Sequence, residues 1–518
     1  MATAETKKST PSAAAANTST AVPDVKLLIG GQWKSSKTTR WGEVFNPSRG
    51  TLIAKVPLCA ADEIDAAVQA AAAALPKWAE TPVVERTKVM FRMRELMTKH
   101  FDELAALVTR EHGKTAAEAR ASVERGVEMV EFSCGIPSLI MGQQLDNIAT
   151  NVDSETSRHP VGVCVGITPF NFPCMVPLWM FPVAITCGNT FVLKPSEKVP
   201  LSGVRLGELL MEAGLPPGVF NIVHGDKECV DALLTHPLVR AISFVGSTAV
   251  AKHVYETGTK HGKRVQAAGG AKNHLIIMPD ADLGQAVKAI QASAFGCAGE
   301  RCMAGSLAVP VGGIADSLVE GLVKVGNEMK VGPTDGDATV DMGPVISSQH
   351  RDKVASYLDV AAKEGAAVAL DGRKRDLPAD GFLLGPSVVD QVKPGMRLAK
   401  EEIFGPVLSV MRAKNLDDAL AMGRDCEYGN GACIFTSSGH AAREFKRHFN
   451  AGMIGINVGV PAPMAWFPFT GWNKSFFGDL HIQGTESIAF YTQQKMTLTR
   501  WFKSASEDTA DPVWKTKR

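Results

Sequence analysis

The sequence lacks several features that would assign it to a specialised class of protein. Its 55 Lys and Arg residues nearly equal its 54 Asp and Glu residues, and there is no long run of like charges that would form a patch for nucleic acid or anionic lipid. The ten cysteines are scattered singly along the chain, which indicates free thiols in a reducing compartment. We therefore expect partners that are small molecules or further copies of the chain.

The sequence predicts neither a membrane-spanning helix nor a leader peptide. The stretch 161–193 contains no charged side chain, but its four prolines would remove helix donors that lipid cannot replace. We interpret this stretch as buried strands and loops. Residues 1–24 are rich in Ala, Ser and Thr and have neither arginine nor an apolar run, so we expect a disordered N-terminal arm.

What the sequence does contain is the alternating pattern of α/β domains. Its 518 residues and 45% hydrophobic content allow more than one core. A helical region is predicted over 62–132, with Asp62 as an N-cap and Gly113 as a helix end. Four short β-branched runs then alternate with helical segments over 161–247, which predicts a parallel, doubly wound sheet. A second alternating series begins near His274 and predicts a second α/β domain.

Three motifs follow predicted strands of the first series. In ISFVGST, Ser247 opens a helix whose free N–H groups suit a phosphate, although an ordinary helix cap also explains it. In NTFVLKPSE, Lys194 and Glu197 suit ribose hydroxyls, or lie in a solvated loop. In TPFNFP, Asn171 either satisfies backbone groups or donates to an oxygen that becomes negative during a reaction. The usual dinucleotide fingerprint G-x-G-x-x-G is absent.

The stretch FGCAGERCM places two cysteines close together. A metal site would need a second pair of soft ligands, which the sequence does not offer, and a disulfide conflicts with the expected compartment. A buried structural cysteine is the commonest case, but it would not normally lie beside Arg301. A thiol beside Arg301 and near a helix N-terminus is expected to lose its proton more readily than a free thiol. Cys302 is therefore the candidate nucleophile, and Cys297 is interpreted as its structural neighbour.

Five motifs, TPFNFP, NTFVLKPSE, ISFVGST, GERC and EEIFGP, occur in this order, and together they resemble the NAD-dependent aldehyde dehydrogenase superfamily over nearly the whole chain. The resemblance implies an aldehyde dehydrogenase-like α/β fold with two doubly wound domains and a small β oligomerisation element. It implies a NAD-binding domain over 25–142 and 161–270 and a catalytic domain over 271–475. The oligomerisation element and the C-terminal tail would occupy 143–160 and 476–518.

The resemblance also implies roles for individual residues. Cys302 is the implied nucleophile, and its backbone N–H forms an oxyanion hole with Asn171. Lys194 and Glu197 would hold the adenosine ribose of NAD, and Glu402 of EEIFGP the nicotinamide ribose. The full set of implied NAD-binding residues is Thr168, Phe170, Lys194, Glu197, Lys198, Ser247, Gly269 and Glu402, with Ser247 at the pyrophosphate, Phe170 along the cofactor and Lys198 where the family has an arginine. No metal is expected.

One departure from the family's sequence motifs indicates which acyl acceptor completes the reaction. Hydrolytic members carry Glu-Leu-Gly-Gly-Lys, whose Glu activates water, whereas this chain reads QAAGGAKNH and is expected to place Ala267 there. Without that base, a thiol cofactor is the better acyl acceptor, since a thiolate attacks a thioester readily. QAAGGAKNH, GERCMA and MVPLWMFP resemble the methylmalonate-semialdehyde dehydrogenase branch, which is CoA-acylating. The two arginines that hold the substrate carboxylate in that branch match Arg125 and Arg301.

The resemblance therefore implies oxidation of malonate or methylmalonate semialdehyde with NAD, loss of CO₂, and release of acetyl-CoA or propionyl-CoA. The alternatives are a hydrolytic aldehyde dehydrogenase that gives a free acid, a thiol hydrolase that uses no nicotinamide, and an inactive binding relative. A homo-oligomer is expected, as a dimer of dimers, without nucleic acid or membrane partners. The compartment is predicted to be a bacterial cytoplasm, or the mitochondrial matrix in a eukaryote.

Overall fold

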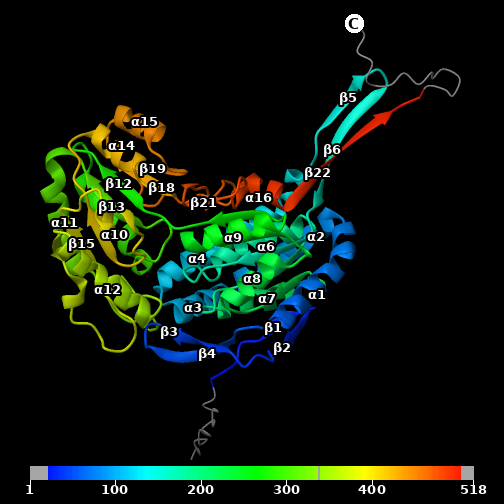
Figure 1. Cartoon of the computed structure of the whole chain (residues 1–518), viewed down its shortest axis with the longest axis horizontal. Coiled ribbons are helices and arrows are strands. Elements are labelled where there is room, and N and C mark those ends of the chain that lie inside the picture. Colours follow the sequence, from blue (N-terminus) through cyan, green and yellow to red (C-terminus); the bar gives the residue numbers. More distant parts are fainter. Residues whose placement is uncertain (1–21, 337–338, 503–518) are drawn as a thin grey trace, which may run out of the picture.

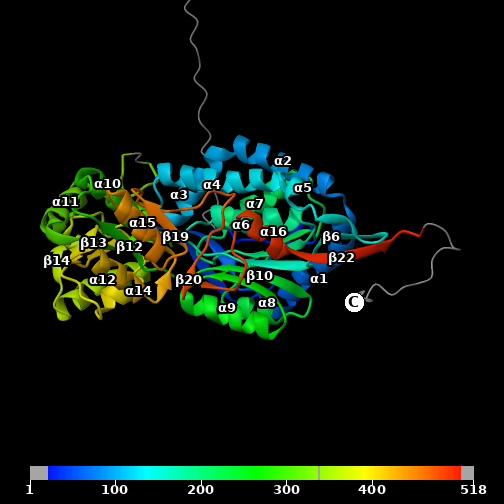
Figure 2. The ribbon, with the colours of Figure 1, turned by 90° about the horizontal axis from the view of Figure 1, so that it is seen from above.

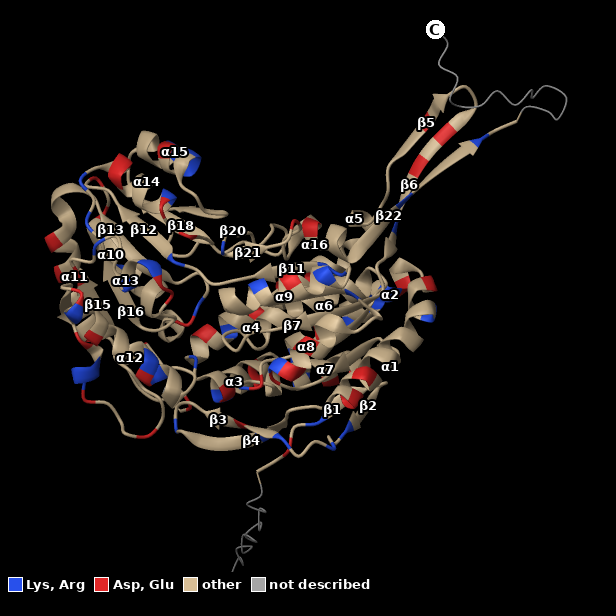
Figure 3. Ribbon diagram, in the orientation of Figure 1, with Lys and Arg blue, Asp and Glu red and all other residues tan. Residues whose placement is uncertain are grey.

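The computed structural model describes residues 22–336 and 339–502. Figure 1 shows two α/β lobes side by side, with a narrow β arm projecting from the lobe that contains the N-terminal half of the chain. Most of the predicted N-terminal arm, residues 1–21, lies outside the described residues. Figure 3 shows basic and acidic residues interspersed over both lobes, as the balanced composition leads one to expect.

An eight-stranded sheet forms the centre of the first lobe. In spatial order its strands are β2 (Gln32–Lys34), β1 (Leu27–Ile29), β9 (Phe220–Ile222), β8 (Thr190–Lys194), β7 (Val163–Ile167), β10 (Val239–Val245), β11 (Arg264–Ala268) and β21 (Phe476–Phe477). The strands from β9 to β11 are parallel, whereas β1, β2 and β21 join by antiparallel pairing. The chain order reverses between β7 and β10, and such a switch point opens a crevice at the carboxyl ends of the strands.

Helices cover both faces of this sheet, as Figure 2 shows from above. The helices on one face are α1 (Ala61–Glu80), α8 (Lys227–Thr235) and α9 (Thr248–Lys260). The helices on the other side, some of them in a second layer, are α2 (Val83–Lys99), α3 (Phe101–His112), α4 (Ala116–Cys134), α5 (Ile136–Leu139), α6 (Met175–Thr186), α7 (Leu201–Glu212) and α16 (Gly484–Tyr491). The strands between them alternate side chains toward the two layers, and nearly every residue of β7, β8 and β10 is buried, as expected for a sheet covered on both faces.

The structure corrects two local predictions in this lobe. Asp62 is not an N-cap: α1 begins after Ala60, and Asp62 lies in the first turn, where the helix dipole favours a carboxylate. The stretch 161–193 is not only strands and loops, because its centre is the fully buried helix α6. Its Pro177 lies in the first turn, where backbone N–H groups have no helical partner to lose. By contrast, the predicted end of α3 at Gly113 is confirmed by a left-handed φ of 90°.

None of the described helices is long and apolar enough to cross a membrane. The helix α6 illustrates why, since all of its side chains are apolar or small but it has only 12 residues. Its apolar surface is instead covered by the sheet and by α4, α2 and α16. A helix that is apolar all round is expected in such a buried position.

The second lobe is built on a seven-stranded sheet. In spatial order its strands are β14 (Ala367–Leu370), β15 (Ser387–Asp390), β16 (Val407–Val410), β13 (Gly305–Pro310), β12 (Asn273–Ile277), β18 (Gly431–Phe435) and β19 (Met453–Ile456). All pairs are parallel except β14 with β15. Its helices are α10 (Leu283–Phe295) and α11 (Ala315–Glu328) on one face, α14 (Leu416–Arg424) and α15 (Gly439–His448) on the other, and α12 (Ser348–Lys363) with α13 (Arg397–Lys400) near β14.

The β arm consists of β5 (Gln144–Ala149), β6 (Val152–Pro160) and β22 (Thr492–Arg500), all antiparallel. The segment 476–518, predicted to hold the oligomerisation element and the C-terminal tail, begins with residues that pack in the first lobe. The strand β21 pairs with β11 of the first sheet, and α16 packs against α6. The chain therefore returns to the core of the first lobe before β22 joins the arm.

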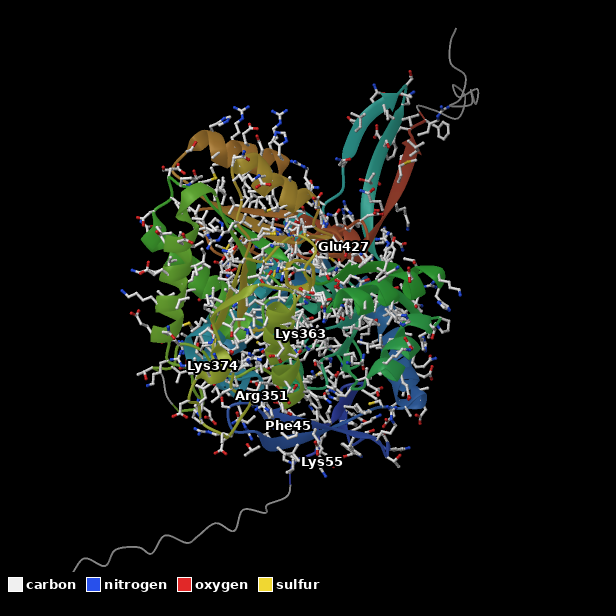
Figure 4. The ribbon with its side chains drawn as sticks, turned by 60° about the vertical axis from the view of Figure 1, so that its left-hand side comes forward. Phe45, Lys55, Arg351, Lys363, Lys374 and Glu427 are labelled. Atoms are coloured by element: carbon white, nitrogen blue, oxygen red, sulfur yellow. The ribbon has the colours of Figure 1, made fainter. Side chains whose placement is uncertain are left out.

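A hairpin of β3 (Trp41–Asn46) and β4 (Thr51–Pro57) connects the two lobes. Figure 4 labels Phe45 and Lys55 on this hairpin, below α12 with its labelled Arg351 and Lys363. The ring of Phe45 meets the edge of Phe382 of the second lobe at 6.0 Å between centroids. A second link is the short antiparallel pair β17 (Tyr428–Gly429) and β20 (Trp472–Asn473). These two contacts link the first lobe to the second beside the crevice that separates them.

Candidate active site

Cys302 lies where two cavities meet. It lines a cleft of about 870 Å³ and also a separate, narrower pocket. The first lobe supplies residues that follow its parallel strands, such as Asn171 after β7. The second lobe supplies residues that precede its strands, such as Cys302 before β13 and Glu402 before β16. The carboxyl edge of one sheet therefore faces the amino edge of the other across the thiol.

Backbone contacts fix the loop that carries this thiol. The 3₁₀ segment Gly296–Gly299 precedes it and includes two left-handed residues, Cys297 at φ 51° and Ala298 at φ 52°. At Gly299 a side chain would stand 2.2 Å from the backbone oxygen of Gly405, so only glycine fits. The carbonyl oxygen of Cys302 accepts hydrogen bonds from the side-chain amides of Asn273 at 2.9 Å and Asn430 at 2.8 Å.

The expected acidity of this thiol is wrong. Burial, together with the negative charge of Glu402, raises the pKa of the Cys302 thiol to about 12. Arg301 does not offset this effect, because its Nε donates to the Cys297 sulfur at 3.1 Å. Cys302 also lies in a turn before β13 rather than at the start of a helix. The thiol is thus protonated at neutral pH, and its proton must be removed before it reacts.

The large cleft gathers nearly all the residues predicted to bind a dinucleotide. Those that line it are Thr168, Phe170, Lys194, Glu197, Ser247, Gly269 and Glu402, and the predicted oxyanion-hole residue Asn171 lines it as well. Lys198 does not line the cleft, and its ammonium lies over the ring of Phe170 at 5.1 Å. Phe170 is also in edge contact with Phe404, with ring centroids 5.7 Å apart.

Two groups in the cleft suit the two ends of a dinucleotide's adenosine diphosphate half. The Lys194 ammonium donates to a Glu197 carboxylate oxygen at 3.1 Å. Burial alone would raise the pKa of Glu197, but the Lys194 charge and the hydrogen bonds outweigh it, and the pKa is lowered. Ser247 precedes α9 without capping it through its side chain. The N–H groups of the first turn of α9 are therefore left to an anion at the positive end of the helix dipole.

Glu402 enters the same cleft from the second lobe. One of its carboxylate oxygens accepts from the backbone N–H of Ala271 at 3.0 Å. Burial raises the pKa of Glu402 to about 7, so it is partly protonated at neutral pH. A side chain at Gly270 would stand 2.4 Å from the other carboxylate oxygen. The glycine at this position therefore makes room for Glu402 beside the thiol loop.

Asn171 is almost fully buried, with 4% of its surface exposed. It lines the cleft together with Cys302. Its side-chain amide makes no hydrogen bond to any residue in the described part of the chain. Buried amides are normally paired. The N–H donors of Asn171 are therefore available to an oxygen bound beside the sulfur.

The narrower pocket is mostly apolar but contains two guanidinium groups. Its lining includes Phe172, Met175, Trp179, Met303 and Phe469, together with Arg125, Glu128, Arg301 and Cys302. Arg125 comes from α4 and pairs with Glu128 at 2.9 Å, and it also contacts the Met464 sulfur. The structure thus brings both predicted arginines into one pocket that ends at the thiol.

Comparison with known proteins agrees with this arrangement. Residues 33–497 match the model of the aldehyde dehydrogenase family. The chain belongs to this family. It is 52% identical over 477 residues to malonate-semialdehyde dehydrogenase of Halalkalibacterium halodurans, a match that covers 92% of this chain and 98% of that protein.

Solved structures of the family show the same fold. The methylmalonate-semialdehyde dehydrogenase of Oceanimonas doudoroffii aligns with a TM-score of 0.92 at 47% identity, over 94% of this chain and all of that one. A protein of Sinorhizobium meliloti 1021, solved in complex with NAD, aligns with a TM-score of 0.92 at 44% identity, over 94% and 100% of the two chains. The predicted aldehyde dehydrogenase-like fold is confirmed.

Two buried alanines end β11, and Ala267 is the one predicted in place of the hydrolytic base of other family members. Side chains alternate along β11, and Ala267 packs into the cluster on the α1, α8 and α9 side of the sheet. Ala268 packs into the cluster of the opposite side, against which Cys302 also packs. Neither residue has a carboxylate.

Sequence reasoning missed several residues around this aldehyde dehydrogenase site. His350, Lys353 and Tyr357 line the cleft from one face of α12, and their helical spacing after a Ser347 cap was an available signal. Glu300 of GERC is fully buried, and burial raises its pKa to about 8. The described residues contain no cluster of three or more His, Cys, Asp or Glu suited to a metal ion.

Proposed function

We propose that this protein oxidises malonate or methylmalonate semialdehyde with NAD and transfers the acyl group to CoA with loss of CO₂. The observation that carries this proposal is the position of Cys302 between a dinucleotide cleft and a pocket with two arginines. Ala267, which stands where hydrolytic members of the family carry a glutamate, offers no carboxylate to activate water. The names of the relatives described above support the same substrate class.

The cleft fits NAD by the chemistry of its lining. Lys194 and Glu197 would hold the adenosine ribose, and Ser247 with the start of α9 the pyrophosphate. Glu402 would hold the nicotinamide ribose. Thr168, Phe170 and Gly269 would line the rest of the path, with Lys198 supporting Phe170 from behind. When bound, NAD supplies the acceptor for the hydride that leaves the substrate.

The chain's own residues carry out the addition step. The Cys302 sulfur, once deprotonated, attacks the aldehyde carbon and forms a thiohemiacetal. The carbonyl oxygen becomes negative in this step. The unpaired amide of Asn171 and the backbone N–H of Cys302 would donate to that oxygen. Loss of hydride from the same carbon then leaves a thioester on Cys302.

The pocket explains how the acyl group is shortened and released. Arg125 and Arg301 would hold the carboxylate of the 3-oxo acid. In the thioester, that carboxylate stands on the carbon next to the thioester carbonyl, so the bond to CO₂ can break as its electrons move to the carbonyl oxygen, held as an enolate. Protonation of the carbon gives an acetyl or propionyl thioester. The thiolate of CoA then displaces Cys302 and gives acetyl-CoA or propionyl-CoA.

Product analysis by mass spectrometry tests this proposal. Purified protein would be incubated with NAD and either semialdehyde, with and without CoA. We expect acyl-CoA, CO₂ and reduced nicotinamide in the presence of CoA, and a much slower reaction without it. The Cys302→Ala variant is expected to lose activity by at least about 10³-fold. Equal rates with and without CoA, with release of free acid, would support a hydrolytic enzyme instead.

The division of labour between the lobes is part of the same proposal. We assign NAD binding to 25–142 with 161–270, and acyl chemistry to 271–475. The β arm, whose strand β22 exposes Met496 and Leu498, is proposed as the oligomerisation element. Light scattering of a variant with both residues changed to Asp tests this, and a smaller assembly is expected. The ten free cysteines fit a reducing compartment such as a bacterial cytoplasm.

A further inference from the structure

A buried cluster beside the narrower pocket involves three residues to which the reaction gives no role. We call Lys114, Glu118, Cys297 and Arg301 the Arg301 cluster. Lys114 and Glu118 flank the start of α4, while Cys297 and Arg301 come from the loop before the catalytic thiol. Only Arg301 lines the pocket. The question is what the other three do.

Arg301 is held by three different acceptors. Its Nε donates to the Cys297 sulfur at 3.1 Å, one terminal nitrogen donates to the Ala292 carbonyl at 3.2 Å, and the other donates to Glu118 at 3.1 Å. A guanidinium has five N–H donors, so two remain after these three bonds. Its side chain is 22% exposed. Arg301 is thus fixed in place with donors left over for a group in the pocket.

Glu118 ties this guanidinium to the helix that carries the second arginine. The carboxylate oxygen that accepts from Arg301 also accepts from the backbone N–H of Cys297 at 2.6 Å. The other oxygen accepts from the backbone N–H of Thr115 at 3.2 Å, and the Thr115 hydroxyl accepts from the Glu118 N–H, which forms a capping box. Arg125 follows two turns later on the same face of α4. One carboxylate therefore sets the start of α4 and the direction of Arg301.

Cys297 acts as an acceptor between two cations. Its sulfur lies 3.2 Å from the Lys114 ammonium and 3.1 Å from Arg301 Nε. Lys114 is 1% exposed, lies over the Phe172 ring at 3.7 Å, and has no carboxylate ion-pair partner within the described ranges. A buried cation requires a compensating group nearby. The sulfur of Cys297 and the carboxylate of Glu118 provide it for the two cations of the cluster.

We propose that Glu118 is a positioning residue that selects carboxylate-bearing aldehydes by fixing Arg301 at the pocket. This inference rests on the function proposed above. Glu118 does not line the pocket, so it acts through Arg301. A long side chain that is already ordered loses little conformational entropy when it binds an anion. Without Glu118, Arg301 would keep its charge and its bonds to Cys297 and Ala292 but lose the one charged acceptor that fixes its direction.

The test compares two aldehydes that differ only at the end recognised by Arg301. Malonate semialdehyde carries a carboxylate where propanal carries a methyl group. The kcat and KM of both would be measured for wild type and for Glu118→Gln, with NAD and CoA saturating. We expect the variant to lower kcat/KM for malonate semialdehyde about tenfold, mainly through KM. The value for propanal is expected to change less than about twofold.

A matched control comes from the same helix. Glu131 of α4 also pairs with an arginine, Arg94, at 2.9 Å, but on the exposed surface. Glu131→Gln removes the same charge and is expected to leave both substrates unaffected. If Glu118→Gln fails to fold, Cys297→Ser provides a second variant, with a smaller selective loss expected because the hydroxyl is a shorter acceptor for Arg301.

Each outcome separates this inference from the proposed function. Equal losses for both aldehydes, or no loss for either, would overturn the positioning role of Glu118. A wild-type enzyme that selects malonate semialdehyde while Glu118→Gln retains that selection would overturn only the inference. A wild-type enzyme that does not distinguish the two aldehydes, or that releases free acid without CoA, would overturn the proposed function itself.

Discussion

The two cavities that meet at Cys302 are built in different ways. The dinucleotide cleft takes its polar groups from the carboxyl ends of parallel strands and the loops that follow them, such as Lys194 at the end of β8 and Ser247 after β10. The narrower pocket takes its two arginines from a helix of one lobe and a loop of the other, and the rest of its lining is mostly apolar. The cleft thus depends on local strand-to-loop geometry, whereas the pocket depends on how the lobes are packed together.

The polar groups of the two cavities also differ in whether they already have hydrogen-bond or ion-pair partners within the protein. In the pocket, Arg301 is held by three acceptors and Arg125 by Glu128. In the cleft, the amide of Asn171 has no partner among the described residues, and the first N–H groups of α9 lack a side-chain cap. The cleft therefore offers open donors to a ligand, while the pocket offers charges whose direction is set in advance.

Among the substitutions that compare the two cavities, removal of the Asn171 side chain is expected to change the activity most, because Asn171 lies where the cavities meet. Asn171→Ala removes the donor to the negative oxygen and is expected to lower kcat by about 10²- to 10³-fold. Binding of NAD, measured by calorimetry, should stay within about twofold of wild type. A loss of NAD affinity equal to the loss of kcat would show that Asn171 serves the cleft and not the reaction.

A substitution in the cleft away from Cys302 should weaken the binding of NAD without changing the binding of the semialdehyde. Lys194→Ala removes the ammonium that pairs with Glu197, and the Kd of NAD is expected to rise about tenfold or more. The KM of the semialdehyde at saturating NAD should hardly change. Lys88→Ala is the control, since Lys88 pairs with Glu85 on the surface at 2.7 Å. A rise in the semialdehyde KM for Lys194→Ala would mean that the two cavities are coupled.

The sequence predicts the cleft better than the pocket, for a physical reason. Lys194, Ser247 and Asn171 follow β-branched runs, and the carboxyl ends of neighbouring parallel strands meet at one edge, so their gathering can be inferred locally. The hydrogen bond from Arg301 to Glu118 joins residues 183 positions apart. The spacing of apolar residues along the sequence cannot predict such a contact. The predicted acidity of Cys302 is wrong for the same reason, because the position of Arg301 in the sequence does not show that its guanidinium points to Cys297.

The raised pKa of Cys302 gives a direct chemical test of its surroundings. Only the thiolate is alkylated, and its fraction grows with pH below the pKa, which is about 12. The rate of iodoacetamide labelling of Cys302, followed by mass spectrometry, should therefore rise about tenfold per pH unit between about pH 7 and 10. Glu402→Gln removes a negative charge and should speed labelling about threefold above pH 8. A rate that levels off below about pH 9 would show that the thiol is acidic after all.

The smallest expected effect concerns the acid inside the pocket. Glu128 pairs with Arg125, and both side chains are partly exposed, so the pair is worth only about 0.2–1 kcal/mol. Glu128 also carries the same charge as the substrate's carboxylate and competes with it for Arg125. Glu128→Gln is therefore expected to lower the KM of malonate semialdehyde about two- to threefold and to leave that of propanal unchanged. Steady-state kinetics would measure both.

The control for this change is Glu124→Gln, an exposed residue one turn earlier on α4 that does not line the pocket. Glu124→Gln removes one negative charge from α4, as Glu128→Gln does. If the KM depended only on the net charge of this helix, both variants would change it equally. A higher KM in Glu128→Gln alone would reverse the interpretation of the ion pair. Glu128 would then hold Arg125 in the direction that binds substrate, as Glu118 is proposed to hold Arg301, and both arginines of the pocket would depend on a neighbouring carboxylate.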